Sequence, residues 1–279
     1  MSTLETNSIG KYNGNNVSVD DALRFKNYTT TQRDALSSPE AGDVIYNSTT
    51  GTIDFYNGSS WNATSSTTFT VDISYLVIAG GASGAGGGQA NQSGGGGGAG
   101  GYRSSYSTDA SGGGGSTEST ITLTPDGSTN YTVTVGAGGA AANDAARGNN
   151  GSNSVFSTIT STGGGGGANY FNNTGNNGGS GGGGAQEGYS RAGGNGTTNQ
   201  GYGGGSGNNS GSGCAGGGGG AESTGYNAVS YAGGSGVVIL RYSNSFTISV
   251  GAGLTHTTTS SGSDTIATFT AGTGNVTWS

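Results

Sequence analysis

The chain has 279 residues, 65 of them glycine, and only 29% of its residues are hydrophobic and 8% are charged. Globular chains are usually ~45–50% apolar in a count that includes glycine, but glycine has no side chain to bury, so an ordinary globular core along most of this chain is excluded. With eight Lys and Arg residues and a net charge of −7, binding to nucleic acid through a basic patch is excluded as well.

The composition also excludes several other classes of protein. Two prolines and the lack of a Gly-X-Y period rule out collagen, and a single cysteine, Cys214, rules out an internal disulfide. Residues 1–10 lack the basic and apolar regions of a secretory signal. No apolar run approaches the ~20 residues of a membrane span. We therefore expect a protein that is made in the cytoplasm without a signal peptide and does not insert into membranes.

The first of three predicted regions covers residues 1–67, which contain few glycines and both lysines. A threonine N-cap predicts a short helix over residues 29–36. Two β-type runs, 42–47 and 52–57, surround a polar turn and predict a hairpin. Trp61 follows as the expected anchor of a small core. We expect this region to attach the protein to a larger assembly or to form a β-rich neck.

The second predicted region covers residues 68–243 and contains the glycine runs. It opens with an apolar, β-branched strand over residues 70–79 and closes with another over 237–242. Residues 121–123 and 131–135, on either side of a Pro-Asp-Gly turn, predict a hairpin. The two apolar strands are expected to pair with each other or with this hairpin.

The third predicted region, residues 244–279, returns to alternating apolar and polar positions. Its β-type runs cover residues 246–250, 265–270 and 276–278. This pattern is typical of half-buried strands, so we predict a small β module at the C-terminus.

All but ten of the 65 glycines lie between residues 80 and 236. Glycine has no side chain to bury and loses more backbone freedom on folding than any other residue. A bundle of polyglycine-II helices, with three residues per turn and hydrogen bonds to neighbouring helices, could satisfy such a backbone. The alternative is a flexible linker of the Gly/Ser type.

Order is favoured because the runs are regularly punctuated and lie between the two apolar strands. We therefore predict a mainly β fold with an irregular glycine-rich domain, built as a polyglycine-II helix bundle. One short α-helix is expected near the N-terminus.

Several segments resemble bacteriophage proteins. Residues 25–36, 42–47 and 55–61 look like a module common in tail-fibre proteins. The glycine-rich domain of phage tail fibres, especially those of marine phages, is similar to residues 75–81, 97–103, 154–159 and 236–239. A looser similarity is to the glycine-rich tip adhesins of T-even-like phages, in which the runs form polyglycine-II sandwiches and the intervening loops bind receptors.

This resemblance implies a virion protein of the tail fibre or fibre tip. It implies a homotrimer that contacts other tail or fibre proteins through its N-terminal region and a host receptor, protein or glycan, through its loops. A self-assembling structural filament without a receptor is the alternative.

Aromatic and arginine side chains between the glycine runs are the candidate receptor contacts. Exposed aromatic rings on a stiff scaffold suit stacking on sugars or contact with a membrane protein. The alternative is that these side chains cap the glycine bundle. The candidates are Tyr102, Arg103, Tyr106, Tyr170, Phe171, Tyr189, Arg191 and Tyr226.

Catalytic, metal and cofactor sites are not expected. His256 is the only histidine, and Cys214 lies in a glycine run without a nearby cation, so neither a catalytic triad nor a reactive thiol is indicated. Asp109, Asp126 and Asp144 are scattered and form no calcium-binding loop. A surface-polysaccharide depolymerase is a second alternative, but such enzymes usually place paired carboxylates on a long β-helix, which this sequence lacks. We predict that the protein is not an enzyme and uses no cofactor.

Overall fold

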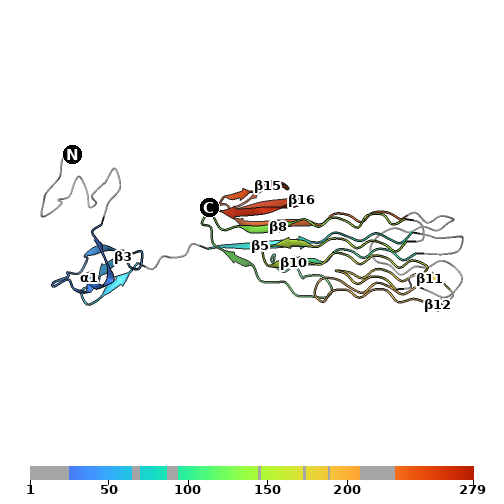
Figure 1. The fold of residues 1–279 in the computed structure, drawn as a ribbon, viewed down its shortest axis with the longest axis horizontal. Helices are drawn as coiled ribbons and strands as arrows, with labels where there is room; N and C mark the ends of the chain where they lie inside the picture. The colour runs from blue at the N-terminus through green and yellow to red at the C-terminus, as the bar shows by residue number, and fades with distance from the viewer. Residues whose placement is uncertain are drawn as a thin grey trace. The chain divides into compact units, whose positions relative to one another are not determined.

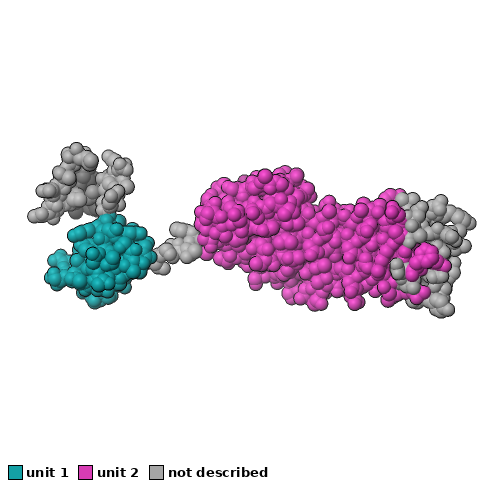
Figure 2. Space-filling model, viewed as in Figure 1, with its two compact units in different colours: residues 1–68 teal, residues 69–279 magenta. Residues whose placement is uncertain are grey.

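The computed structural model describes residues 25–64, 70–86, 94–143, 146–171, 174–187, 189–207 and 230–279, with residues 186, 187, 189 and 190 described by backbone alone. The chain divides into two compact units, residues 1–68 and residues 69–279 (Figure 2). The second unit includes both the glycine runs and the C-terminal strands that were predicted as a third region.

The first unit is a four-stranded sheet in the order β1-β2-β3-β4, with one short helix. Helix α1 begins in a capping box, in which the side chains and backbones of Thr29 and Gln32 hydrogen-bond reciprocally. The predicted hairpin is confirmed, and the predicted helix is found but is shorter. The elements are β1 (Asn27–Tyr28), α1 (Thr30–Asp34), β2 (Val44–Asn47), β3 (Thr52–Tyr56) and β4 (Trp61–Ala63).

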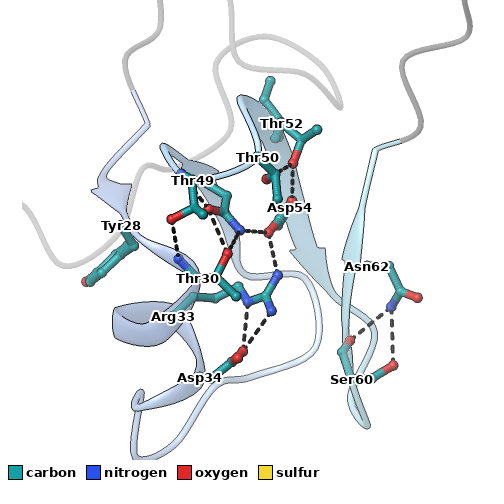
Figure 3. A network of polar contacts seen from close by, with 12 residues as sticks. Tyr28, Thr30, Arg33, Asp34, Thr49, Thr50, Thr52, Asp54, Ser60 and Asn62 are labelled. Atoms are coloured by element: carbon teal, nitrogen blue, oxygen red, sulfur yellow. Dashed lines mark hydrogen bonds and ion pairs between the residues drawn. The ribbon is translucent and has the colours of Figure 1, made fainter.

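The interior of the first unit is polar. Asp54 and Asn47 are fully buried, and Figure 3 shows the helix and the hairpin joined through the Asp54 carboxylate. Arg33 donates to this carboxylate at 2.7 Å, Asn47 at 2.9 Å and Thr52 at 2.7 Å. Ile45 is the one buried apolar side chain in residues 25–64. Trp61, the predicted core anchor, is only half-buried against Tyr56.

The second unit contains a ten-stranded antiparallel sheet that follows the path β10-β9-β8-β16-β13-β5-β6. Strand β7 pairs with β5, and both β14 and β15 pair with β16. The strands are β5 (Val71–Ile78), β6 (Tyr102–Ser104), β7 (Ile121–Leu123), β8 (Tyr131–Thr134), β9 (Ser154–Phe156), β10 (Ile159–Ser161), β13 (Val237–Ser243), β14 (Ile248–Val250), β15 (Leu254–Ser261) and β16 (Asp264–Trp278).

Strand β16 connects the two halves of this sheet. Its first part pairs with β13 and β15, and its last part pairs with β8 and β14. Between the two parts, Gly272 has a φ of +98°, and a Cβ built there would lie 1.8 Å from the carbonyl oxygen of Gly253. Only glycine fits both constraints. Gly272 thus allows the unusual backbone at the point where the strand changes partners.

A hydrophobic core lies within this sheet. Trp278 is completely buried, and its ring packs edge-on against Tyr131, Phe156 and Tyr242 at centroid distances of 5.7, 6.2 and 5.8 Å. Since Tyr242 belongs to β13 and Phe156 to β9, the penultimate residue of the chain holds the two halves of the sheet together.

The pairing of the two most apolar strands is confirmed, because β5 and β13 are antiparallel neighbours with Val238 opposite Val77. The predicted hairpin of residues 121–123 and 131–135 is wrong. Strand β7 pairs with β5, whereas β8 pairs with β9 and β16. The Pro-Asp-Gly turn between them therefore joins strands with different partners. The C-terminal strands pair with β8 and β13, which places them in the same sheet as the rest of the unit.

The glycine runs leave this sheet as extended segments that travel out and back side by side (Figure 1). We call these segments the glycine rows. The described rows are residues 79–86, 94–101, 135–143, 146–153, 162–171, 174–179, 180–187, 191–197, 201–207 and 230–236.

Hydrogen bonds between the rows repeat every three residues. In row 79–86, every third N–H donates to the same neighbouring row: Ala79, Ala82 and Ala85 donate to row 94–101, and Gly80, Ser83 and Gly86 donate to row 146–153. Row 162–171 behaves alike, with Gly164 and Gly167 bonded to row 79–86 and Gly165 and Ala168 to row 180–187.

A helix with three residues per turn turns successive N–H groups toward three different neighbours. A three-residue spacing is what a polyglycine-II bundle would produce, and the bundle itself stays a prediction. The mainly β fold class, with one short helix near the N-terminus, is confirmed.

The rows need glycine because their backbones lie so close together. A Cβ built on Gly95, Gly151 or Gly167 would lie 1.9–2.0 Å from a carbonyl oxygen of a neighbouring row. At Gly81 and Gly84 the nearest atoms are 3.6–3.7 Å away, which is ordinary contact. Backbone hydrogen bonds, and not side-chain packing, are what the inner positions provide.

Candidate functional site

The far end of the glycine rows, opposite the core sheet, is the candidate functional site. Alternate rows run in opposite directions, so the chain reverses there after residues 86, 143, 171, 187 and 207. Figure 1 shows the short strands β11 (Gln186–Glu187) and β12 (Tyr189–Ser190) at this end. The far end thus brings together the ends of several rows on one hydrogen-bonded scaffold.

Tyr170 and Phe171 form an aromatic pair at the far end of row 162–171. Their ring centroids are 5.0 Å apart and their planes are nearly perpendicular, at 83°. The Phe171 side chain is 66% exposed, whereas Ala168 and Asn169, just before the pair, are buried among the rows. A buried row therefore delivers an exposed phenyl ring to the surface.

Two arginines make hydrogen bonds between rows at the same end. The guanidinium of Arg147 donates to the carbonyl oxygen of Thr174, which connects row 146–153 to the row that begins at residue 174. The carbonyl oxygen of Arg191 accepts the N–H of Gly207 at 2.8 Å, and the Arg191 side chain is half-buried. Both arginines therefore join neighbouring rows near the far end, Arg147 through its side chain and Arg191 through its backbone.

Tyr189 lies in strand β12, where it is opposite Glu187 of strand β11, and its side chain is outside the described atoms. Tyr226 lies outside the described residues, as do Cys214 and Asp144. The structure thus brings three of the eight predicted residues, Tyr170, Phe171 and Arg191, to the far end with described side chains.

Tyr102 and Arg103 lie at the opposite end, and their predicted position in a loop is wrong. Row 94–101 continues directly into strand β6, where Arg103 is opposite Val77 of β5. The two residues are therefore part of the core sheet.

Arg103 is also fully engaged by neighbouring groups. Its guanidinium donates to both carboxylate oxygens of Glu118, at 2.8 and 2.5 Å. The hydroxyls of Tyr75 and Ser111 donate to the same carboxylate at 2.8 and 2.9 Å. Burial raises the pKa of the Glu118 carboxyl, but the bonds from Arg103, Tyr75 and Ser111 outweigh it and hold the pKa below its ordinary value. This cluster stabilises the sheet end.

Tyr106 also lies at the sheet end, where Arg241 contacts it. The guanidinium carbon of Arg241 lies 5.0 Å from the centre of the Tyr106 ring, and an Arg241 nitrogen donates to the Tyr106 hydroxyl at 2.8 Å. Both residues border a cleft of about 180 Å³, together with Leu76, Ile239 and Ile266. Tyr106 is accessible, but it does not belong to the far-end surface.

Tyr202 was not among the predicted contacts. Its side chain is 69% exposed, and its carbonyl oxygen accepts the N–H of Gly181 near the sheet end. Tyr231, also highly exposed at 61%, follows Ser230, whose hydroxyl donates to Gly84 near the far end. For Tyr202, an aromatic residue between two glycines was the available signal, whereas Tyr231 is one of the aromatic residues that the sequence places between glycine runs.

The described residues offer little for catalysis. The His256 ring stacks on Phe269 with centroids 5.7 Å apart. Asp126 closes a turn by accepting the N–H groups of Ser128 and Thr129. No group of three or more His, Cys, Asp or Glu side chains that could hold a metal ion occurs within the described ranges.

Comparison with known families agrees with this architecture. Residues 49–215, more than half of the chain, match the family described as a glycine-rich domain. The chain belongs to this glycine-rich domain family. Residues 7–74 match a second family, described as a phage tail like trimerisation region. No curated protein and no solved structure matches the chain.

The two matches together support a phage tail-type protein that carries a glycine-rich domain and forms homotrimers. They also support its place as a component of the virion. The similarity to marine phages in particular stays a prediction. In the parts of the chain that the structure describes, no helix is long and apolar enough to cross a membrane.

Proposed function

We propose that this glycine-rich protein is a tail-fibre or fibre-tip component that recognises a receptor on the host surface through the far end of its glycine rows. The observation that carries the proposal is the exposed Phe171 ring, paired with Tyr170, at the end of a buried and hydrogen-bonded row. Aromatic rings provide large contact areas and stack on sugar faces or fill apolar pockets.

The hydrogen-bonded rows also favour recognition, because they fix the surface in advance. Binding is weakened by the entropy lost when a loop becomes ordered, so a preorganised surface binds more tightly. The rows are held together by backbone bonds of 2.7–3.3 Å at three-residue intervals. Their ends are therefore positioned before a receptor arrives.

The role proposed here is binding, without an enzymatic reaction. The N-terminal unit, which matches the trimerisation region, is proposed to join the copies of the chain and to contact other tail proteins. The receptor is proposed to be a surface glycan or an outer-surface protein, the two ligand classes that exposed aromatic rings suit.

An adsorption assay tests the proposal. Phage carrying both Tyr170→Ser and Phe171→Ser should adsorb to host cells about tenfold more slowly or worse, because aromatic anchors often contribute ~2 kcal/mol to binding. Tyr202→Ser is the matched control, since it removes an equally exposed ring at the sheet end. It should leave adsorption unchanged.

Equal adsorption of all three phages would overturn the proposal. A structural filament without a receptor predicts that result, and it also predicts that the purified chain polymerises into long fibres visible by electron microscopy.

A further inference from the structure

One face of the first unit's sheet is apolar and exposed. In the register of strands β2 and β3, Val44 is opposite Phe55 and Tyr46 is opposite Ile53. All four side chains lie on the same face because each alternates with a neighbour on the other face. They are 37–40% exposed. We call these four residues the apolar face.

The other face of the same two strands is mainly polar, although it includes Ile45 and Tyr56. It holds Asn47, Thr52 and Asp54, and the buried carboxylate of Asp54 accepts from Arg33 of helix α1. A sheet with one covered face normally buries its apolar side and exposes its polar side. Here the helix covers the polar side, so the apolar side is left for a partner.

The small core of this unit leads to the same conclusion. Ile45 is the one buried apolar side chain within residues 25–64. A domain of this size seldom reaches adequate stability from its own core and commonly relies on disulfides, metals or oligomerisation. Burying the apolar face between copies of the chain would supply the missing core.

We propose that the apolar face is the contact between subunits in the homotrimer, with the four residues of each copy facing a common threefold axis. The whole face lies within residues 7–74, which match the trimerisation region. Polar residues border it, since Asn27 is opposite Tyr46 and Asn62 is opposite Phe55. An apolar centre with a polar rim is the usual composition of a protein interface.

Mass measurement of the full chain tests this assignment. Sedimentation velocity should give about 80 kDa, three times the 26.8 kDa of one chain. Ile53→Asp should raise the trimer dissociation constant at least about 100-fold, because three carboxylates would be brought together in an apolar contact. Tyr202→Asp, the matched control in the second unit, should remain trimeric.

Cross-linking provides a second readout that does not depend on how Ile53→Asp folds. In a Cys214→Ser background, Phe55→Cys should form covalent dimers with a short bismaleimide. Thr50→Cys, exposed in the turn of the same hairpin but off the apolar face, should form few. The assignment is overturned if the wild-type chain is a monomer. In that case other residues of the same chain could cover the apolar face. It is also overturned by a folded Ile53→Asp chain that stays trimeric, or by equal cross-linking at both positions.

Discussion

The guanidinium of Arg33 donates a hydrogen bond of 2.7 Å to the carboxylate of Asp54, whose side chain has no exposed surface (Figure 3). Burial raises the pKa of Asp54, but hydrogen bonds from Thr52, Asn47 and Arg33, together with the charge of Arg33, hold the pKa below its ordinary value of 3.8. The ionised form of the Asp54 carboxylate is therefore more stable in the folded unit than in the unfolded chain.

A pH dependence follows from the lowered pKa of Asp54. The stabilisation is complete above the ordinary value of 3.8 and is lost as the pH falls from there through the lower pKa of the folded state. Asp54→Asn should reduce this acid sensitivity and lower the free energy of unfolding at pH 7 by about 1–3 kcal/mol. Thermal unfolding of the first unit between pH 2 and pH 7 measures both effects. A variant with unchanged acid sensitivity would contradict the assignment.

Gly151→Ala should strongly destabilise the glycine rows. Its Cβ would lie 1.9 Å from the carbonyl oxygen of Gly80, so two rows would have to separate. Gly234→Ala is the matched control, because no atom lies within 4 Å of its added Cβ. Restricting the unfolded chain at this position should leave stability unchanged or raise it by about 0.4–1 kcal/mol. Melting temperatures of the two variants measure the difference, and equal losses would show that the rows are not closely packed.

Amide hydrogen exchange should be slow along the rows. The N–H groups of Gly164 and Gly167 bond to row 79–86 and that of Gly165 bonds to row 180–187, so their exchange requires two neighbouring rows to separate from this one. We expect protection by a factor of about 1,000 or more relative to the unfolded chain. Rapid exchange across residues 163–183 would indicate a flexible linker in place of the scaffold.

Trp278 should be the most sensitive position of the core. Trp278→Ala is expected to cost about 3–5 kcal/mol, because it removes a completely buried ring that contacts both halves of the sheet. Trp278→Phe should cost less. It keeps an aromatic ring and removes Nε1, which is buried without a hydrogen-bond partner in the described part of the chain. Denaturant unfolding followed by circular dichroism compares the two variants.

Local patterns predict the strands that have strong apolar signals. The hairpin of β2 and β3 follows from alternation around a turn, and β5 and β13 follow from their β-branched runs. Strand β15 was not predicted, because seven of its eight residues are exposed and its Thr-rich sequence lacks apolar alternation. Strand β15 forms because its backbone hydrogen-bonds to β16, and its own side chains give no sign of a strand.

Long-range pairing explains the other differences. The turn after Leu123 suggested a hairpin, but β8 pairs with Gly274 and Val276, more than a hundred residues away. Alternation also predicted a sheet in the first unit without showing that its inner face is polar. The inner face can be polar because Arg33 of the helix pairs with the buried carboxylate of Asp54.

The candidate site was predicted only in part, for a geometric reason. Segments between glycine runs occur at both ends of the rows, and their composition is similar. Tyr102 and Phe171 therefore look equivalent in the sequence, although one lies in the core sheet and the other at the far end. Whether a given segment lies at the sheet end or at the far end depends on how many times the chain has changed direction before it. The type of a single residue does not indicate this.

The three-residue repeat of the row hydrogen bonds restricts how this protein can diversify. Inserting one residue within a row would rotate every following N–H by about 120° toward the wrong neighbour, whereas three residues would restore the directions and add about 9 Å of length. The reversals at the far end carry no such restriction. Length variation among related chains should therefore be free in the segments that join the rows and confined to multiples of three within the rows, so the far-end surface can change while the scaffold stays the same.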